Sequence, residues 1–221
     1  QNSEYGGHNY YVGLSLASLG FIVVSITGRG TPGRDKAFYT HHYGDDSFNS
    51  DLKDRIAGIR QLGERFPYMD LDRVGITGDE NPVNNAIYGA LLHSNFYKVA
   101  VVTNMPDSRL MTIRELSEPT YKIISETPRS AYPEQCVDFF NGKLLLIHTL
   151  GVGAYPSPTL LLVNALIKAN KDFDMLLLPN DGHEISSYAQ RRTWDYLVTH
   201  LQGIEPPKEF AFKGAFDRVL G

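Results

Sequence analysis

A sharp strand-to-helix turn in the first half of the chain carries residues that could do chemistry. An apolar stretch at 73–77 is followed by Gly78-Asp79-Glu80-Asn81-Pro82 and then by a helical pattern through Ala86, Ile87, Ala90 and Leu91. Turns of this form present a nucleophilic serine when they read G-x-S-x-G. Glu80 stands at the serine position, and a carboxylate cannot attack as an alkoxide does. Serine chemistry is therefore not expected at this turn.

The other reactive residue types form no recognisable site. Cys136 is the only cysteine and has no accompanying histidine motif, so we expect a structural thiol. No pair with zinc-site spacing and convincing second ligands occurs among His8, His41, His42, His93 and His200. Gly28-x-Gly30 lacks the rest of the dinucleotide-binding fingerprint. We predict neither a metal nor a cofactor.

Alternating strand and helix patterns indicate how the turn is positioned. Apolar runs of strand length occur at Phe21–Ile26, Val74–Thr77, Val99–Thr103, Leu144–His148 and Met175–Leu178. Each is continuous, as is typical of strands buried on both faces of a parallel sheet. Helical spacing links Leu52, Ile56, Ile59, Leu62 and Phe66, and later Trp194, Leu197, Val198 and Leu201.

The fold class predicted from this alternation is α/β. We expect one domain over residues 1–221, with a doubly wound, mostly parallel sheet and helices on both faces. Asn49 or Ser50 is expected to cap the first helix, Pro67 to close it, and Gly203 to end the last one.

The composition favours a small-molecule or protein partner. The 221 residues include 21 basic and 25 acidic side chains, a net charge of -4, and no basic stripe, so nucleic-acid binding is not expected. No stretch approaches the ~20 apolar residues of a membrane span. The chain starts at a glutamine, so we expect an internal fragment whose localisation stays open.

Four ordered motifs resemble the catalytic domain of the prolyl oligopeptidase (S9) family, including bacterial relatives of dipeptidyl peptidase IV. They are 28–34 (GRGTPGR), 68–76 (YMDLDRVGI), 143–148 (KLLLIH) and 203–207 (GIEPP). The resemblance covers about Leu16 to Phe210. It implies an α/β-hydrolase fold and serine-type peptidase ancestry. It also implies that the family's propeller domain and the first strands of the hydrolase sheet lie outside this chain.

The departures from the family pattern fall on the catalytic positions. By resemblance, Glu80 replaces the serine, and Val152 replaces the acid that follows the strand ending at His148. The catalytic histidine is retained as His183, and Asn81 would supply one oxyanion donor through its backbone N–H. The family's aromatic-rich lining segment is matched only at Arg109-Leu110. The sequence therefore predicts a degenerate triad and a catalytically inactive homologue.

Two functional readings stay open at this point. The first is a binding or structural subunit for a peptide or protein partner. The second is an active hydrolase in which Glu80 acts as a carboxylate nucleophile with His183 and with Asp107 as an alternative acid. The apolar C-terminal residues Phe210, Phe212, Phe216, Val219 and Leu220 are expected either to fold back on the domain or to form a homodimer contact, and folding back is favoured. The resemblance is compatible with a periplasmic or another extracytoplasmic location and also with a cytoplasmic one.

Overall fold

The computed structural model describes residues 8–26, 28–29, 34–40, 47–79, 83–105, 132–151, 155–179 and 186–210. The helices are α1 (His8–Ser18), α2 (Lys36–Thr40), α3 (Ser47–Arg65), α4 (Val83–Leu92), α7 (Ser157–Lys168) and α8 (Ser187–Leu197). Short turns of helix occur at η3 (Pro133–Gln135), η4 (Val137–Phe139) and η5 (Val198–Gln202), and η5 continues α8 as a π-helix. No helix in these ranges is long and apolar enough to cross a membrane.

Four parallel strands form the sheet. They are β1 (Val74–Asp79), β2 (Tyr97–Thr103), β3 (Lys143–Thr149) and β4 (Asp174–Leu178), hydrogen-bonded in the order β1-β2-β3-β4. The two central strands are almost continuously buried, as their unbroken apolar runs predict. Four of the five predicted strands are thus confirmed.

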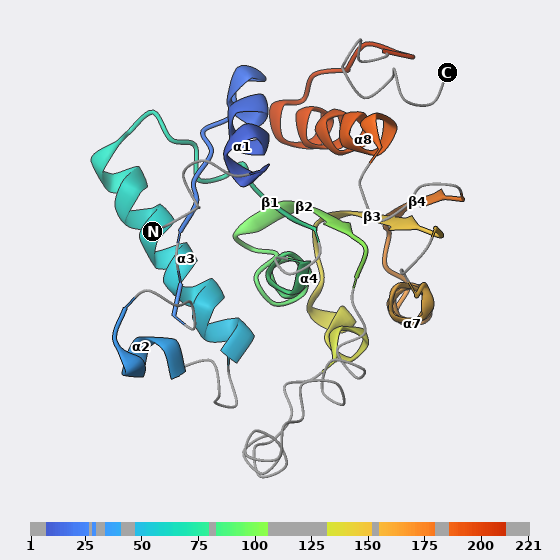
Figure 1. The fold of residues 1–221 in the computed structure, drawn as a ribbon, viewed down its shortest axis with the longest axis horizontal. Helices are drawn as coiled ribbons and strands as arrows, with labels where there is room; N and C mark the ends of the chain where they lie inside the picture. Colours follow the sequence, from blue (N-terminus) through green and yellow to red (C-terminus); the bar gives the residue numbers. More distant parts are fainter. Residues whose placement is uncertain are drawn as a thin grey trace.

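Helices cover both faces of this sheet (Figure 1). Helices α4 and α7 lie on one face, and α1 and α8 lie on the other. The alternation of side chains along β2 and β3 divides the core accordingly: Ala100, Val102, Leu144 and Leu146 pack in the cluster with α4 and α7. Val99, Val101, Leu145 and Ile147 pack in the cluster with α8 and η5. The predicted doubly wound α/β arrangement is confirmed.

The prediction of a strand at Phe21–Ile26 is wrong for the described structure. These six residues belong to no strand and lie next to α1 in the chain. A strand exists only through hydrogen bonds to a neighbouring strand. In the described ranges the one ladder that β1 forms is with β2, so its other edge has no strand beside it. The apolar run is present, but no strand pairs with it within the described residues.

The helix ends predicted from the sequence are confirmed in part. Helix α3 begins at Ser47, so Asn49 and Ser50 lie inside its first turn, and the prediction that one of them caps it is wrong. It ends at Arg65, just before Pro67, as predicted. Gly203 ends η5 with φ of +70°, a left-handed conformation that favours glycine.

The C-terminal region is described only as far as Phe210. Its ring is half exposed, and its backbone carbonyl accepts a hydrogen bond from Arg191 Nη1 at 3.1 Å. The other apolar residues of this region lie outside the described residues. Folding back and pairing with a second subunit both remain predictions.

Candidate active-site edge of the sheet

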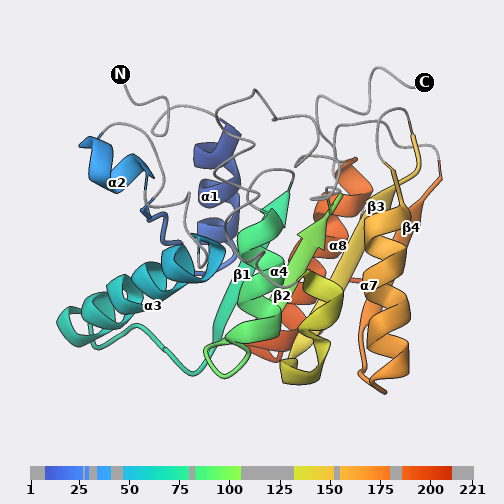
Figure 2. The same cartoon turned by 90° about the horizontal axis from the view of Figure 1, so that it is seen from below.

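The carboxyl ends of the four strands meet along one edge of the sheet (Figure 2). Asp79 of β1 is in register with Thr103 of β2, and Thr103 with Ile147 of β3. Thr149 of β3 is in register with Leu178 of β4. In open α/β sheets ligands bind at this edge, in the loops that follow the strands. This edge is therefore where a functional site belongs.

All of the site residues predicted from sequence lie outside the described residues. These residues are Glu80, Asn81, Asp107, Val152 and His183. Their described flanks end at Asp79 after β1, at Met105 after β2, at Gly151 after β3 and at Pro179 after β4. The structure thus brings together the strand ends that carry the predicted residues, and the mutual geometry of those residues stays a prediction.

A small polar cluster joins the ends of β2 and β3 at this edge. The side-chain oxygen Oδ1 of Asn104 accepts hydrogen bonds from the Thr149 backbone N–H at 2.9 Å and from Thr149 Oγ1 at 3.0 Å. The Asn104 backbone N–H donates to the Ile147 carbonyl at 2.9 Å. Asn104 has a φ of +52°, which asparagine tolerates better than most residues. This cluster fixes how the chain leaves two neighbouring strands.

Sequence reasoning missed the Asn104 cluster, although one signal was present. An asparagine directly after a buried strand is a frequent choice for a left-handed turn, because its short polar side chain can bond the local backbone. Its hydrogen-bond partner, Thr149, is 45 residues further along the chain and is recognisable only from the β2–β3 register.

Replacing Asn104 with alanine is expected to lower the free energy of unfolding by about 2 kcal/mol. The change removes an acceptor of two hydrogen bonds, each worth about 0.5 kcal/mol at the low end, and adds a cost of about 1 kcal/mol for alanine at positive φ. Asn104→Gly keeps the backbone freedom and loses only the hydrogen bonds, so urea denaturation should place it between the parent and Asn104→Ala. An equal loss in both variants would contradict the contribution of the backbone conformation.

His148 lies buried on β3, on the face covered by α7. Its Nδ1 and the Thr159 hydroxyl share a hydrogen bond of 3.0 Å, and its Nε2 has no hydrogen-bond partner among the described residues. Burial lowers the pKa of the imidazole, so the neutral form is favoured. We therefore interpret His148, buried and hydrogen-bonded to Thr159, as a structural group near the carboxyl end of β3.

The lowered pKa of His148 predicts how stability depends on pH. The unfolded chain binds a proton on this histidine at about pH 6.5, more readily than the folded protein does. The stabilisation is fully present above that pH and is lost as the pH falls toward the lowered folded pKa. We expect His148→Gln to flatten the loss of stability between about pH 7 and 5 in urea titrations.

His200 provides the matched control for this pH experiment. Burial and the nearby Lys143 also lower its pKa, but the residue is exposed in the middle of the η5 turn, so its effect should be much smaller. If His200→Gln flattened the pH profile and His148→Gln did not, the role given to His148 would be wrong.

Comparison with known proteins decides the family. A model of the prolyl oligopeptidase family matches residues 9–203. The chain belongs to the prolyl oligopeptidase family. Dipeptidyl peptidase 8 of Homo sapiens and of Mus musculus are each 26% identical to it over an alignment of 200 residues that covers 83% of this chain and 21% of those proteins. The chain therefore spans about a fifth of the length of these relatives.

Solved structures agree with the α/β-hydrolase fold of this prolyl oligopeptidase family domain. Porphyromonas gingivalis dipeptidyl peptidase 4 superposes with a TM-score of 0.61 at 18% identity, over 79% of this chain and 26% of that one. An acylaminoacyl peptidase from Pyrococcus horikoshii gives a TM-score of 0.62 at 18% identity, over 83% and 32% of the two chains. The sheet and its covering helices are those of this fold.

The glycine and arginine that begin the family-like GRGTPGR motif have a structural role here. Arg29 Nη2 donates to Asp54 Oδ1 on α3 at 2.8 Å, and Arg29 Nε donates to the other carboxylate oxygen. Gly28 packs so closely on Asp51 that a Cβ at this position would lie 1.3 Å from the Asp51 Oδ1 atom. Gly28 and Arg29 thus fix the start of this motif against α3, and residues 30–33 lie outside the described residues.

Asp51 connects α3 to the helix that follows β1. Its Oδ2 accepts hydrogen bonds from Arg55 Nε at 3.0 Å and from Asn85 Nδ2 at 2.9 Å. Asn85 lies in the first turn of α4, which begins just after the predicted elbow. The family domain thus holds the start of α4 in place through hydrogen bonds that involve none of the predicted catalytic residues.

Proposed function

We propose that this prolyl oligopeptidase family domain is catalytically inactive and acts as a binding or structural subunit for a peptide or protein partner. The observation that carries the proposal is the residue type at two positions of the family pattern. Glu80 stands where the nucleophilic serine belongs, and Val152 stands where the acid belongs. Glutamate has no hydroxyl group that could form an alkoxide, so the covalent route of a serine peptidase is lost. Valine has no carboxylate, so the catalytic histidine loses the group that orients it.

The arrangement of the sheet supports this proposal. The two altered positions follow β1 and β3, and one strand, β2, separates these. The ends of β2 and β3 are joined by the hydrogen bonds that Thr149 donates to Asn104. The start of α4 is held by the hydrogen bond that Asn85 donates to Asp51. These interactions preserve the fold at the site edge without requiring a working triad. A domain that keeps its fold while its catalytic positions change is suited to binding.

A carboxylate-nucleophile hydrolase is the second candidate function. One observation favours it: β1 and β2 are neighbours, and Asp79 is in register with Thr103. Glu80 and Asp107 follow these two strands within a few residues, so both belong to the same edge of the sheet. With His183 after β4, this set would provide a nucleophile, a base and an acid.

A labelling experiment with a fluorophosphonate probe tests whether the chain has an activated serine, which neither the inactive subunit nor the carboxylate-nucleophile hydrolase would have. Such probes form a covalent bond with an activated serine, and we expect no labelling of the purified chain, in contrast to a family peptidase with an intact triad. Labelling of any serine would overturn the proposal. Ester hydrolysis that is lost in Glu80→Gln would instead establish the carboxylate-nucleophile alternative.

A further inference from the structure

Residues 203–210 form a mostly exposed strap that runs back along α8 (Figure 1). Gly203 ends η5 with φ of +70° and reverses the direction of the chain. At the other end of the strap, the Phe210 carbonyl accepts a hydrogen bond from Arg191 Nη1, in the second turn of α8, at 3.1 Å. The seven residues after Gly203 can extend over about 25 Å, and the helix from Arg191 to Gln202 is only about 17 Å long. The strap therefore returns along most of α8 and η5.

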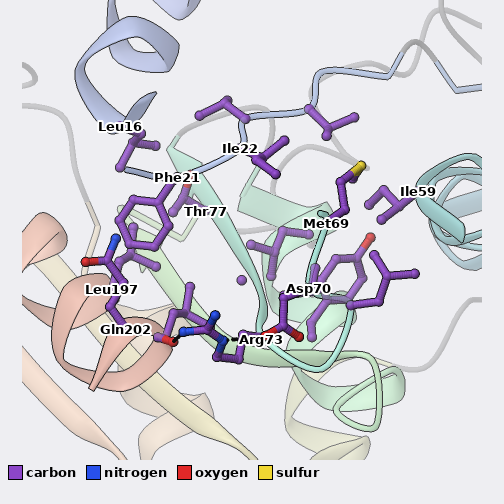
Figure 3. Close-up of a pocket in the computed structure, with 18 of the residues that line it drawn as sticks. Leu16, Phe21, Ile22, Ile59, Met69, Asp70, Arg73, Thr77, Leu197 and Gln202 are labelled. Atoms are coloured by element: carbon purple, nitrogen blue, oxygen red, sulfur yellow. Dashed lines mark hydrogen bonds and ion pairs between the residues drawn. The ribbon is translucent and has the colours of Figure 1, made fainter. Parts of the chain in front are cut away.

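The strap starts from a fixed point near the amino end of β1. Arg73, which directly precedes β1, donates from Nη1 to the Leu201 carbonyl at 3.2 Å. Gln202 Nε2 donates to the Leu19 carbonyl, which follows α1, at 2.8 Å. The close-up in Figure 3 shows Arg73 beside the end of η5 that carries Gln202. Because this end is held, the strap runs from the amino ends of the strands toward their carboxyl ends.

The far end of the strap lies close to the candidate edge of the sheet. Helix α8 begins at Ser187, after the loop that follows β4. Its Ala189 is 0% exposed and belongs to the same apolar cluster as Leu178, the last residue of β4. Arg191 is four residues into the helix, about 6 Å along its axis from Ser187. The chain that continues from Phe210 is therefore brought to this edge.

Large apolar side chains near this edge are exposed to solvent. Leu150 and Tyr155, which follow β3, are 44% and 70% exposed, and Tyr188 in the first turn of α8 is 46% exposed. The Leu150 N–H donates to the Leu178 carbonyl at 2.9 Å, so Leu150 lies beside the end of β4. The ring of Tyr188 lies 5.1 Å from the guanidinium carbon of Arg191, the residue that binds the strap. Exposed apolar groups that gather at one place are typical of an interaction surface.

The segment after Phe210 has the length and the composition to cover this surface. Its eleven residues, 211–221, can extend over about 36 Å, more than the ~14 Å between the first and last of four neighbouring strands. They lie outside the described residues, so their place in the fold is a matter of inference. The large apolar side chains of the segment are Phe212, Phe216, Val219 and Leu220.

We propose that residues 211–221 dock on the candidate edge of their own chain and cover the surface that a peptide partner would use. The inference rests on the proposed binding function of this edge. A segment tethered beside its binding surface has an effective concentration in the millimolar range, well above that of a second copy at micromolar protein concentration. Docking within one chain is therefore favoured over docking between chains. A partner must displace the segment, so the domain is autoinhibited.

A fluorescent synthetic peptide with the sequence of residues 211–221 tests this proposal on the full 221-residue chain. Phe212→Ser combined with Phe216→Ser removes two apolar anchors, so the attached segment should leave the edge. We expect the peptide to bind this double variant in fluorescence anisotropy. It should bind the parent at least about tenfold more weakly, because the attached segment occupies the surface. Circular dichroism should give the same spectrum for both proteins.

A matched pair of lysine substitutions in the double variant locates the binding surface. Leu150→Lys places a charge on the surface at a half-exposed position, so the fold should survive and peptide affinity should fall about tenfold. Ile167→Lys changes a residue that is 62% exposed in the last turn of α7, near the amino ends of the strands, and should leave affinity unchanged.

Four results would overturn the proposal. They are failure of the peptide to bind the double variant, equal binding to the parent and the double variant, and full affinity in the Leu150→Lys protein. The fourth is a parent dimer in analytical ultracentrifugation that dissociates in the double variant, which would show that the segment docks on a second copy. None of these results bears on catalytic inactivity, which fluorophosphonate labelling tests separately.

Discussion

Replacement of Gly28 by alanine is expected to lower the free energy of unfolding by about 3 kcal/mol. The added Cβ would lie 1.3 Å from Asp51 Oδ1, so the carboxylate must move. Asp51 is buried and accepts hydrogen bonds from Arg55 and Asn85, and hydrogen bonds to a charged group are worth about 1.5 to 3 kcal/mol each. Moving it weakens the contact between α3 and the start of α4. Urea denaturation measures the loss.

Gly58 provides the matched glycine-to-alanine control. It lies within α3, and a Cβ there would meet only the Cδ1 atom at the end of the Ile26 side chain, at 3.1 Å. Alanine is the better helix former by about 0.8 kcal/mol, so Gly58→Ala should be close to neutral or stabilising. If Gly28→Ala cost no more than Gly58→Ala, Asp51 would be free to rearrange, and its role as an anchor would be wrong.

Replacement of Leu91 by alanine is expected to lower the free energy of unfolding by about 3 kcal/mol through the cavity that it creates. Leu91 is 0% exposed on α4, in the cluster between the sheet and the helices α4 and α7. Its loss should leave a cavity because the neighbouring strands and helices restrict collapse. Chemical denaturation should show a lower midpoint with an unchanged slope.

The exposed Leu160 on α7 provides the comparison for Leu91. Leu160→Ala removes the same atoms from a side chain that already contacts water, so its cost should stay below about 0.5 kcal/mol. Similar losses in the two variants would mean that α4 does not pack on the sheet as described. The result bears on function because α4 begins at the predicted elbow.

The central strands of the sheet were predicted correctly from the sequence, whereas the strand expected at residues 21–26 was not. Val99–Thr103 and Leu144–His148 are continuous apolar runs, and burial on both faces explains both the run and the strand. Phe21–Ile26 has the same pattern and forms no strand, because pairing depends on a neighbour that periodicity does not report. The prediction that Asn49 or Ser50 caps the first helix was wrong because this helix begins at Ser47, before the apolar pattern starts.

The candidate site rests on residue type and position in the chain, and its residues lie outside the described ranges, so their contacts stay a prediction. The order of strands places Glu80, Asp107, Val152 and His183 after four neighbouring strands, which the motifs and the parallel sheet made foreseeable. The Asn104–Thr149 cluster was missed because its two members meet only through the register of β2 with β3. Contacts of this kind depend on tertiary packing that a single sequence does not contain.

The proposed catalytic inactivity is tested most directly by turnover of the purified chain and of His183→Ala. The substrates are p-nitrophenyl esters and aminoacyl and Xaa-Pro p-nitroanilides, with His200→Ala as a control. His200 lies on η5. The Leu201 carbonyl of the same turn accepts a hydrogen bond from Arg73, which directly precedes β1, so η5 lies near the amino end of β1 and away from the candidate edge. We expect the three proteins to show the same background rate. Turnover by the parent that survives in His200→Ala and is lost in His183→Ala would contradict the proposed inactivity.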